Sequence, residues 1–144
     1  MATGFLDSSG DPHVEIEVIG VYGKPTKMTC LVDTGFSGFL TIPLLQAFPI
    51  GLVLRTTTSV TFANSETENR LTCLGIVRVD GRDETGLILV DSRGGEPILG
   101  MDFLRKFNFR LTVCPSTGSV EFVHVPPPPP PPAAPAAPAT AATP

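Results

Sequence analysis

The amino-acid sequence predicts an all-β fold, a closed barrel or sandwich with one short helix near its C-terminal end. Short runs rich in Val, Ile, Leu, Thr and Phe alternate along the chain with clusters of Gly, Pro, Asp, Asn and Ser. Many short strands separated by such turn signals are typical of barrels and sandwiches. Only the segment 101–107 places apolar residues at helical spacing.

The chain has room for one ordinary domain, because it contains 144 residues of which 42% are hydrophobic. Residues 1–12 are rich in Asp, Ser and Gly and predict a flexible leader. Residues 13–125 predict the folded domain. Residues 126–144 contain only Pro, Ala and Thr, so we expect an extended or disordered tail that cannot pack a core.

The domain begins with three predicted strands. Residues 14–18 alternate apolar and charged side chains, which is the pattern of a half-buried strand. Residues 26–33 and 39–42 form the next two. The apolar residues 44–48 have room for one helical turn, which Pro49 is expected to stop.

The middle of the domain predicts a long hairpin and one more strand. Residues 54–62 are rich in Thr and Val, and residues 70–79 return after a polar turn. Asp80-Gly81 is the strongest hairpin signal in the chain. Residues 85–90 end in a continuous apolar run, which indicates a strand buried on both faces.

The C-terminal end predicts the helix over residues 101–107 and two final strands over 110–114 and 119–125. Two cations near the end of the helix favour it through its dipole. Asp102 is expected to cap the helix, and the alternative is a bond near Ser37.

Charge and composition disfavour several classes of protein. The net charge is -4 and no basic patch is visible, so nucleic-acid binding is disfavoured. No stretch approaches the roughly 18 apolar residues that span a bilayer, and residues 1–5 lack the charged and apolar regions of a signal peptide, so we expect none. We therefore expect a soluble, cytoplasmic protein.

The cysteines and histidines predict no metal site. Cys30, Cys73 and Cys114 are widely spaced in apolar runs and are expected to be buried free thiols. No pair of Cys or His has the spacing of a zinc site. His13 and His124 lie near the ends of the domain and are expected to be exposed or at strand edges, without a role.

The tripeptide Asp33-Thr34-Gly35 occurs once and directly follows the apolar run 28–32. A carboxylate at the end of a buried strand is costly unless it is hydrogen-bonded or its pKa shifts, and shifted carboxylates are catalytic candidates. The alternative is an ordinary turn. A second motif, Ile98-Leu99-Gly100, leads into the predicted helix.

These two motifs, in this order, resemble those of the retropepsin-like aspartic proteases, the single-domain clan AA enzymes of bacteria and retroelements. The resemblance implies that Asp33 is the catalytic residue and that Thr34, Gly35 and Ser37 support it. It also implies that Ile98, Leu99 and Gly100 pack behind the catalytic loop and hold it rigid.

The single copy of the motif further implies a homodimer. Two Asp33 carboxylates, one from each subunit, would share a proton and activate water for hydrolysis of a peptide bond, with no cofactor. The Thr34 hydroxyl would bond across the two-fold axis. Phe36 stands where relatives often have a small residue.

The hairpin over residues 60–72 matches the flap that closes over the substrate in this family. Its predicted tip is Ala63, Asn64 and Ser65, where Asn64 can adopt a left-handed conformation in place of Gly. An extended peptide or protein substrate would pair with this flap.

A second function stays open: a non-catalytic dimerisation or peptide-binding module with the same fold. The intact Asp-Thr-Gly favours the enzyme. Serine chemistry at Ser37 is disfavoured, because no His has an obvious orienting partner. The proline tail is consistent with a spacer or with docking on an unknown partner.

Overall fold

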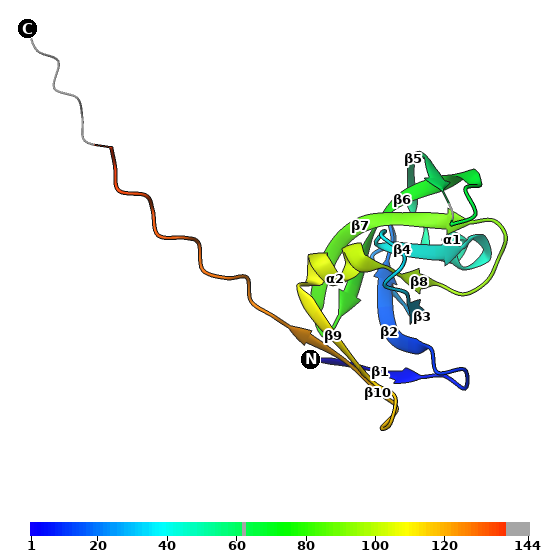
Figure 1. The fold of residues 1–144 in the computed structure, drawn as a ribbon. Helices are drawn as coiled ribbons and strands as arrows, with labels where there is room; N and C mark the ends of the chain where they lie inside the picture. The colour runs from blue at the N-terminus through cyan, green and yellow to red at the C-terminus, as the bar shows by residue number, and fades with distance from the viewer. Residues whose placement is uncertain (62, 138–144) are drawn as a thin grey trace, which may run out of the picture.

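The computed structural model describes residues 1–61 and 63–137 (Figure 1). Its helices within that part of the chain are α1 (Leu44–Ile50) and α2 (Met101–Phe107). Its strands there are β1 (Ala2–Leu6), β2 (Pro12–Ile19), β3 (Pro25–Val32), β4 (Leu40–Pro43), β5 (Val53–Thr61), β6 (Thr67–Val79), β7 (Arg82–Asp91), β8 (Ile98–Leu99), β9 (Phe109–Cys114) and β10 (Ser119–His124).

The strands form one sheet in the order β5-β6-β7-β4-β8-β3-β2-β1-β10-β9. β2 also pairs with β6, from Glu17 opposite Arg78 to Ile19 opposite Ile76, so the sheet folds back on itself. Most neighbours are antiparallel, but β8 runs parallel to β3 and β4 runs parallel to β7. The all-β prediction of a closed barrel or sandwich is confirmed.

The core is built from aliphatic strand residues and a cluster of phenylalanines around α2. Phe103 is fully buried at the centre of this cluster. Its ring centroid lies within 6.4 Å of those of four others, Phe39, Phe107, Phe109 and Phe122. Through these ring contacts the helix packs against β9 and β10.

Residues 1–12 are not a flexible leader. Ala2–Leu6 form β1, which pairs with both β10 and β2. Gly4 lets the strands approach, because a Cβ there would lie 2.1 Å from the carbonyl oxygen of His13. A turn follows, in which the Asp7 carboxylate accepts hydrogen bonds from the backbone of Ser9 and Asp11.

Two helices are present in the described residues, where the sequence predicted one. The segment expected to form a single turn continues through Pro49 to Ile50, and Gly51 ends it in a left-handed conformation with φ of 70°. Proline removes one backbone donor, but it stands in the last turn of a short helix that Ala47 and Ile50 anchor in the core.

The apolar run in β7 is not buried on both faces. Ile88 and Val90 point into the core, whereas Leu87 is 52% exposed. Leu89 is half-buried. The alternation shows that one face of β7 is apolar and open.

Beyond β10, residues 126–137 contain no helix or strand and are exposed, and they lead away from the sheet (Figure 1). The rest of the predicted tail, 138–144, lies outside the described residues. Neither helix described here is long and apolar enough to cross a membrane.

Candidate active site

Asp33 lies directly after β3, in a loop held by backbone hydrogen bonds. Its N–H donates to the carbonyl oxygen of Leu99 at 2.9 Å, and its carbonyl accepts from the N–H of Phe36 at 3.1 Å. Its side-chain Oδ1 accepts from the N–H of Gly35 at 2.8 Å. The carboxylate is therefore oriented by its own turn, while Asp33, Thr34 and Gly35 all remain exposed on the single chain.

β8 lies behind this loop and supports it from two sides. Val32 of β3 pairs in parallel with Leu99, and Leu40 of β4 pairs with Leu99 in the antiparallel sense. Leu99 is fully buried. The short strand thus links the backbone that carries Asp33 to the core.

Gly100 is required by close packing rather than by its backbone angles. A Cβ at this position would lie 2.3 Å from the carbonyl oxygen of Gly38 and 2.5 Å from that of Phe36. Those two carbonyls accept hydrogen bonds from the first N–H groups of α2, at Asp102 and Met101. The missing side chain therefore lets the helix pack against the loop that carries Asp33.

Phe36 is accommodated by the glycines around it. Its ring atoms lie 2.4 Å from where a Cβ of Gly38 would stand and 2.6 Å from where one of Gly100 would stand. The bulky side chain beside the aspartate thus occupies space that two absent side chains leave free.

Two adjoining clefts lie between this loop and the β5–β6 hairpin, with volumes of about 540 and 390 Å³. Both are lined by Phe36 and Ser37 on one side and by Val60 and Thr61 of the hairpin on the other. Leu89 of β7 also lines both. The residues that the two clefts share make them one groove between the loop and the hairpin.

The larger cleft brings together half of the predicted site residues. Asp33, Gly35, Ser37, Ile98 and Ala63 all line it. Leu99 and Gly100 lie behind the loop, as described above, and Thr34 is exposed beside the cleft.

The hairpin tip differs from the prediction. Ser65, with φ of 66°, takes the left-handed conformation that was expected of Asn64. The Asn64 side chain instead accepts from the backbone of Glu66 and donates to its carboxylate. Phe62, which the sequence included in the strand, lies outside the described residues.

Asp102 does not cap α2. The helix has no side-chain cap, and Asp102 Oδ1 accepts a hydrogen bond from Arg105 Nη1 at 3.0 Å. Its backbone N–H already bonds to Gly38, so its side chain is free to pair one turn later along the helix.

Two charged residues of the larger cleft were missed by sequence reasoning. Arg70 Nη2 lies 3.1 Å from Asp91 Oδ2, and both side chains are less than one fifth exposed. The pair forms where β6 leaves its ladder with β7, whose last register pair is Leu71 with Val90. No local pattern reveals such a contact, because it depends on the register of two strands.

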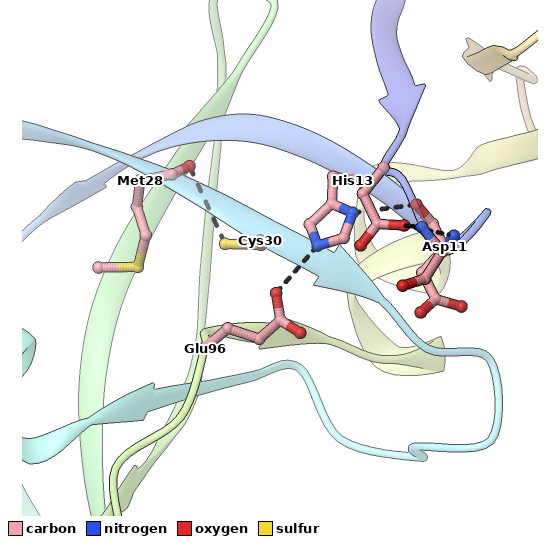
Figure 2. A network of polar contacts seen from close by, with 7 residues as sticks. Asp11, His13, Met28, Cys30 and Glu96 are labelled. Carbon is pink, nitrogen blue, oxygen red and sulfur yellow. Dashed lines mark hydrogen bonds and ion pairs between the residues drawn. The ribbon is translucent and has the colours of Figure 1, made fainter.

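His13 and Cys114 also differ from expectation. His13 is buried, and its ring contacts Glu96 and the backbone of Asp11 (Figure 2). Cys30 and Cys73 are buried as predicted, whereas Cys114 is partly exposed. Hydrogen bonds from the nearby hydroxyls of residues 116 and 117 lower the pKa of the Cys114 thiol to about 7.

No group of three or more His, Cys, Asp or Glu side chains in residues 1–61 and 63–137 is placed to hold a metal ion.

Comparisons with known proteins detect the fold but no relative by sequence. No family model and no curated protein matches the chain. Among solved structures, EIAV protease complexed with the inhibitor HBY-793 matches with a TM-score of 0.56 and 15% identity, over 74% of this chain and 97% of that one.

A retropepsin-like aspartic protease from Rickettsia conorii matches with a TM-score of 0.56 and 17% identity, over 82% of this chain and 86% of that one. The chain therefore has the fold of the retropepsin-like aspartic proteases, as its two motifs predicted.

Proposed function

We propose that the protein is an aspartic endopeptidase that works as a homodimer. The observation that carries this proposal is the exposed Asp33 carboxylate, which Gly35 orients at the floor of a cleft covered by a β-hairpin. A structural aspartate needs no such groove beside it, whereas a catalytic one needs room for an extended substrate.

The dimer supplies the second carboxylate that the chemistry needs. Two Asp33 side chains facing each other across a two-fold axis cannot both ionise cheaply, so one keeps a proton. The ionised carboxylate takes a proton from the attacking water, and the protonated one acts as acid toward the substrate. The two titrations belong to the pair and not to either residue.

The substrate is a peptide or an unfolded protein segment in extended conformation. The groove offers strand edges for its main chain and the apolar side chains of Leu87, Leu89 and Val60 for alternate side chains. The hairpin over the groove acts as a lid that excludes water.

Asp33→Asn tests the proposal. We expect cleavage of a peptide library at acid to neutral pH to be lost by about three orders of magnitude or more, because the base is gone. Asp83→Asn is the matched control, since this aspartate pairs with Arg78 on the surface at the β6–β7 turn. Equal cleavage by the wild type and Asp33→Asn contradicts the assignment.

Mixing tests the shared site. When equal amounts of wild-type and Asp33→Asn chains exchange freely, half of the wild-type chains enter mixed dimers with one carboxylate. We therefore expect activity to fall to about half of that of the same wild-type concentration alone. Unchanged activity, or a monomer in sedimentation at the assay concentration, contradicts the dimeric mechanism. Peptide binding without any cleavage favours the non-catalytic module instead.

A further inference from the structure

His13 is a buried titratable side chain that the proposed reaction does not use. It is 6% exposed on β2, and the Phe5 ring of β1 stacks on it with 5.5 Å between the ring centroids. Its Nδ1 lies 3.0 Å from the carbonyl oxygen of Asp11, and its Nε2 lies 2.9 Å from Oε2 of Glu96 (Figure 2).

Both of these partners are acceptors. A backbone carbonyl and a carboxylate offer lone pairs only, so each ring nitrogen has to bring a hydrogen to its contact. A neutral imidazole carries one hydrogen and would turn the lone pair of its other nitrogen toward an acceptor. The geometry therefore fits the imidazolium cation of His13 beside the Glu96 anion.

The charges around His13 act in the same direction. Burial by itself lowers the pKa of His13, but the hydrogen bonds to Glu96 and Asp11 and the attraction of Glu96 and Asp7 raise it above 6.5. Phe5 is uncharged. Burial, with a smaller effect of Glu96, raises the pKa of the neighbouring Cys30 thiol, so that thiol stays neutral.

Glu96 stands at the entrance to the strand that supports Asp33. The next residue, Pro97, accepts a hydrogen bond through its carbonyl from the N–H of Leu31 at 2.9 Å, and Leu99 accepts from Asp33 at 2.9 Å. The preceding Gly94 and Gly95 have positive φ. Because glycine restricts the backbone less than other residues do, the loop before β8 is only weakly constrained by its own sequence. A side-chain contact at Glu96 is thus well placed to fix where β8 begins.

We propose that His13 is a positioning residue, whose imidazolium holds Glu96 and thereby fixes β8 and the backbone that carries Asp33. Loss of one ring proton removes the positive charge that holds Glu96 and leaves one ring nitrogen with a lone pair facing an acceptor. Because the pKa of His13 is raised on folding, the stabilisation is complete below about pH 6.5 and is lost as the pH rises through the folded-state value. The positioning role rests on the proposed function, but the contact itself does not.

Glu96→Gln separates the contact from its charge. The glutamine amide can accept from Nε2–H or donate to an unprotonated Nε2, so it keeps the hydrogen bond in both states of the ring. His124→Gln is the matched control, because the His124 ring contacts the carbonyl oxygen of Phe107 and the chain has two histidines. All chains carry Cys114→Ser, since that thiol titrates in the same range.

Two measurements need no catalysis. In the wild type and in His124→Gln we expect the melting temperature to fall as the pH rises from about 6.5 to the NMR midpoint of folded His13, and to level off above it. In Glu96→Gln we expect this fall to disappear and the His13 midpoint to drop by about one pH unit or more. The same melting curve and the same midpoint in Glu96→Gln and wild type would overturn the proposal.

The third measurement is the pH profile of peptide cleavage. We expect kcat of the wild type to fall with the His13 midpoint and KM to change little, whereas Glu96→Gln keeps its kcat to higher pH. A melting curve that responds while kcat does not would show a merely structural contact and overturn the positioning role. If the wild type cleaves nothing, the proposed function fails, and the melting and NMR results still decide whether the contact is ionic.

Discussion

The two walls of the cleft are built in opposite ways. The wall that carries Asp33 is fixed by backbone hydrogen bonds, by the buried Leu99 and by the close contact at Gly100. The opposite wall is the β5–β6 hairpin, where β5 is exposed along nearly its whole length. Its strands are joined by polar side chains such as Ser59 and Asn69, whose Oγ and Oδ1 lie 2.7 Å apart.

The difference fits the tasks that the two walls would have in the proposed aspartic protease. A reacting carboxylate has to stay within a few tenths of an ångström of its working position. The residues that support it therefore have to be buried and well packed. A lid has to open for substrate and product, and segments with few buried apolar contacts open at the lowest cost.

Gly100→Ala is expected to lower the unfolding free energy most, because Gly100 makes a very close backbone contact in the wall that carries Asp33. The new methyl group would collide with two backbone carbonyls, which cannot move away as a flexible side chain can. We expect a loss of about 3 kcal/mol or more of unfolding free energy, measured by urea denaturation. Gly35→Ala is the comparison: its Cβ would lie 3.1 Å from the Asp33 carboxylate, so it should fold and lose activity instead.

Leu99→Ala and Val60→Ala compare the two walls directly. Leu99 is fully buried, so its truncation should cost about 2–5 kcal/mol in urea unfolding. Val60 is half-buried in the hairpin, and its truncation should cost about 1 kcal/mol or less. Comparable losses in the two variants would show that the hairpin is as firmly packed as the wall that carries Asp33.

Asp91→Asn is expected to have the smallest effect on stability. It weakens the ion pair with Arg70 at the root of the hairpin, while Arg70 keeps Glu68 within 3.5 Å. We expect about 1 kcal/mol or less in unfolding free energy, together with a rise of about two- to fivefold in KM as the hairpin closes less firmly. Asp83→Asn should leave KM unchanged; an equal rise there would mean that the effect is general.

The wall that carries Asp33 could be predicted from the sequence, because its turns depend on residues that are neighbours in the chain. Asp33 follows its strand directly, and Gly100 follows β8 directly, so the order of residues fixes each turn. At the hairpin tip even local reasoning was insufficient, because Ser65 and not Asn64 adopts the left-handed conformation. Both Asn64 and Ser65 tolerate a turn, and the side-chain bonds of Asn64 to Glu66 accompany the left-handed backbone at Ser65.

Contacts between distant positions could not be predicted. His13 and Glu96 are 83 positions apart, and neither lies in a motif. Leu87 was expected to be buried because it belongs to an apolar run, but the pleat of β7 turns it outward. The N-terminal strand was not predicted because Gly4 lies within it and a polar segment rich in Asp, Ser and Gly follows, although β1 pairs with β10 in the structure.

The position of β1 between β2 and β10 has a consequence for how the domain is made. Ala2 lies opposite Phe122, so β1 cannot complete its pairing during synthesis until β10 has also emerged from the ribosome. Until then β1 has one open edge, and such edges invite pairing with other chains. The domain should therefore fold late in its synthesis. A chain that ends before Ser119 lacks β10, so we expect it to aggregate instead of remaining soluble and partly folded.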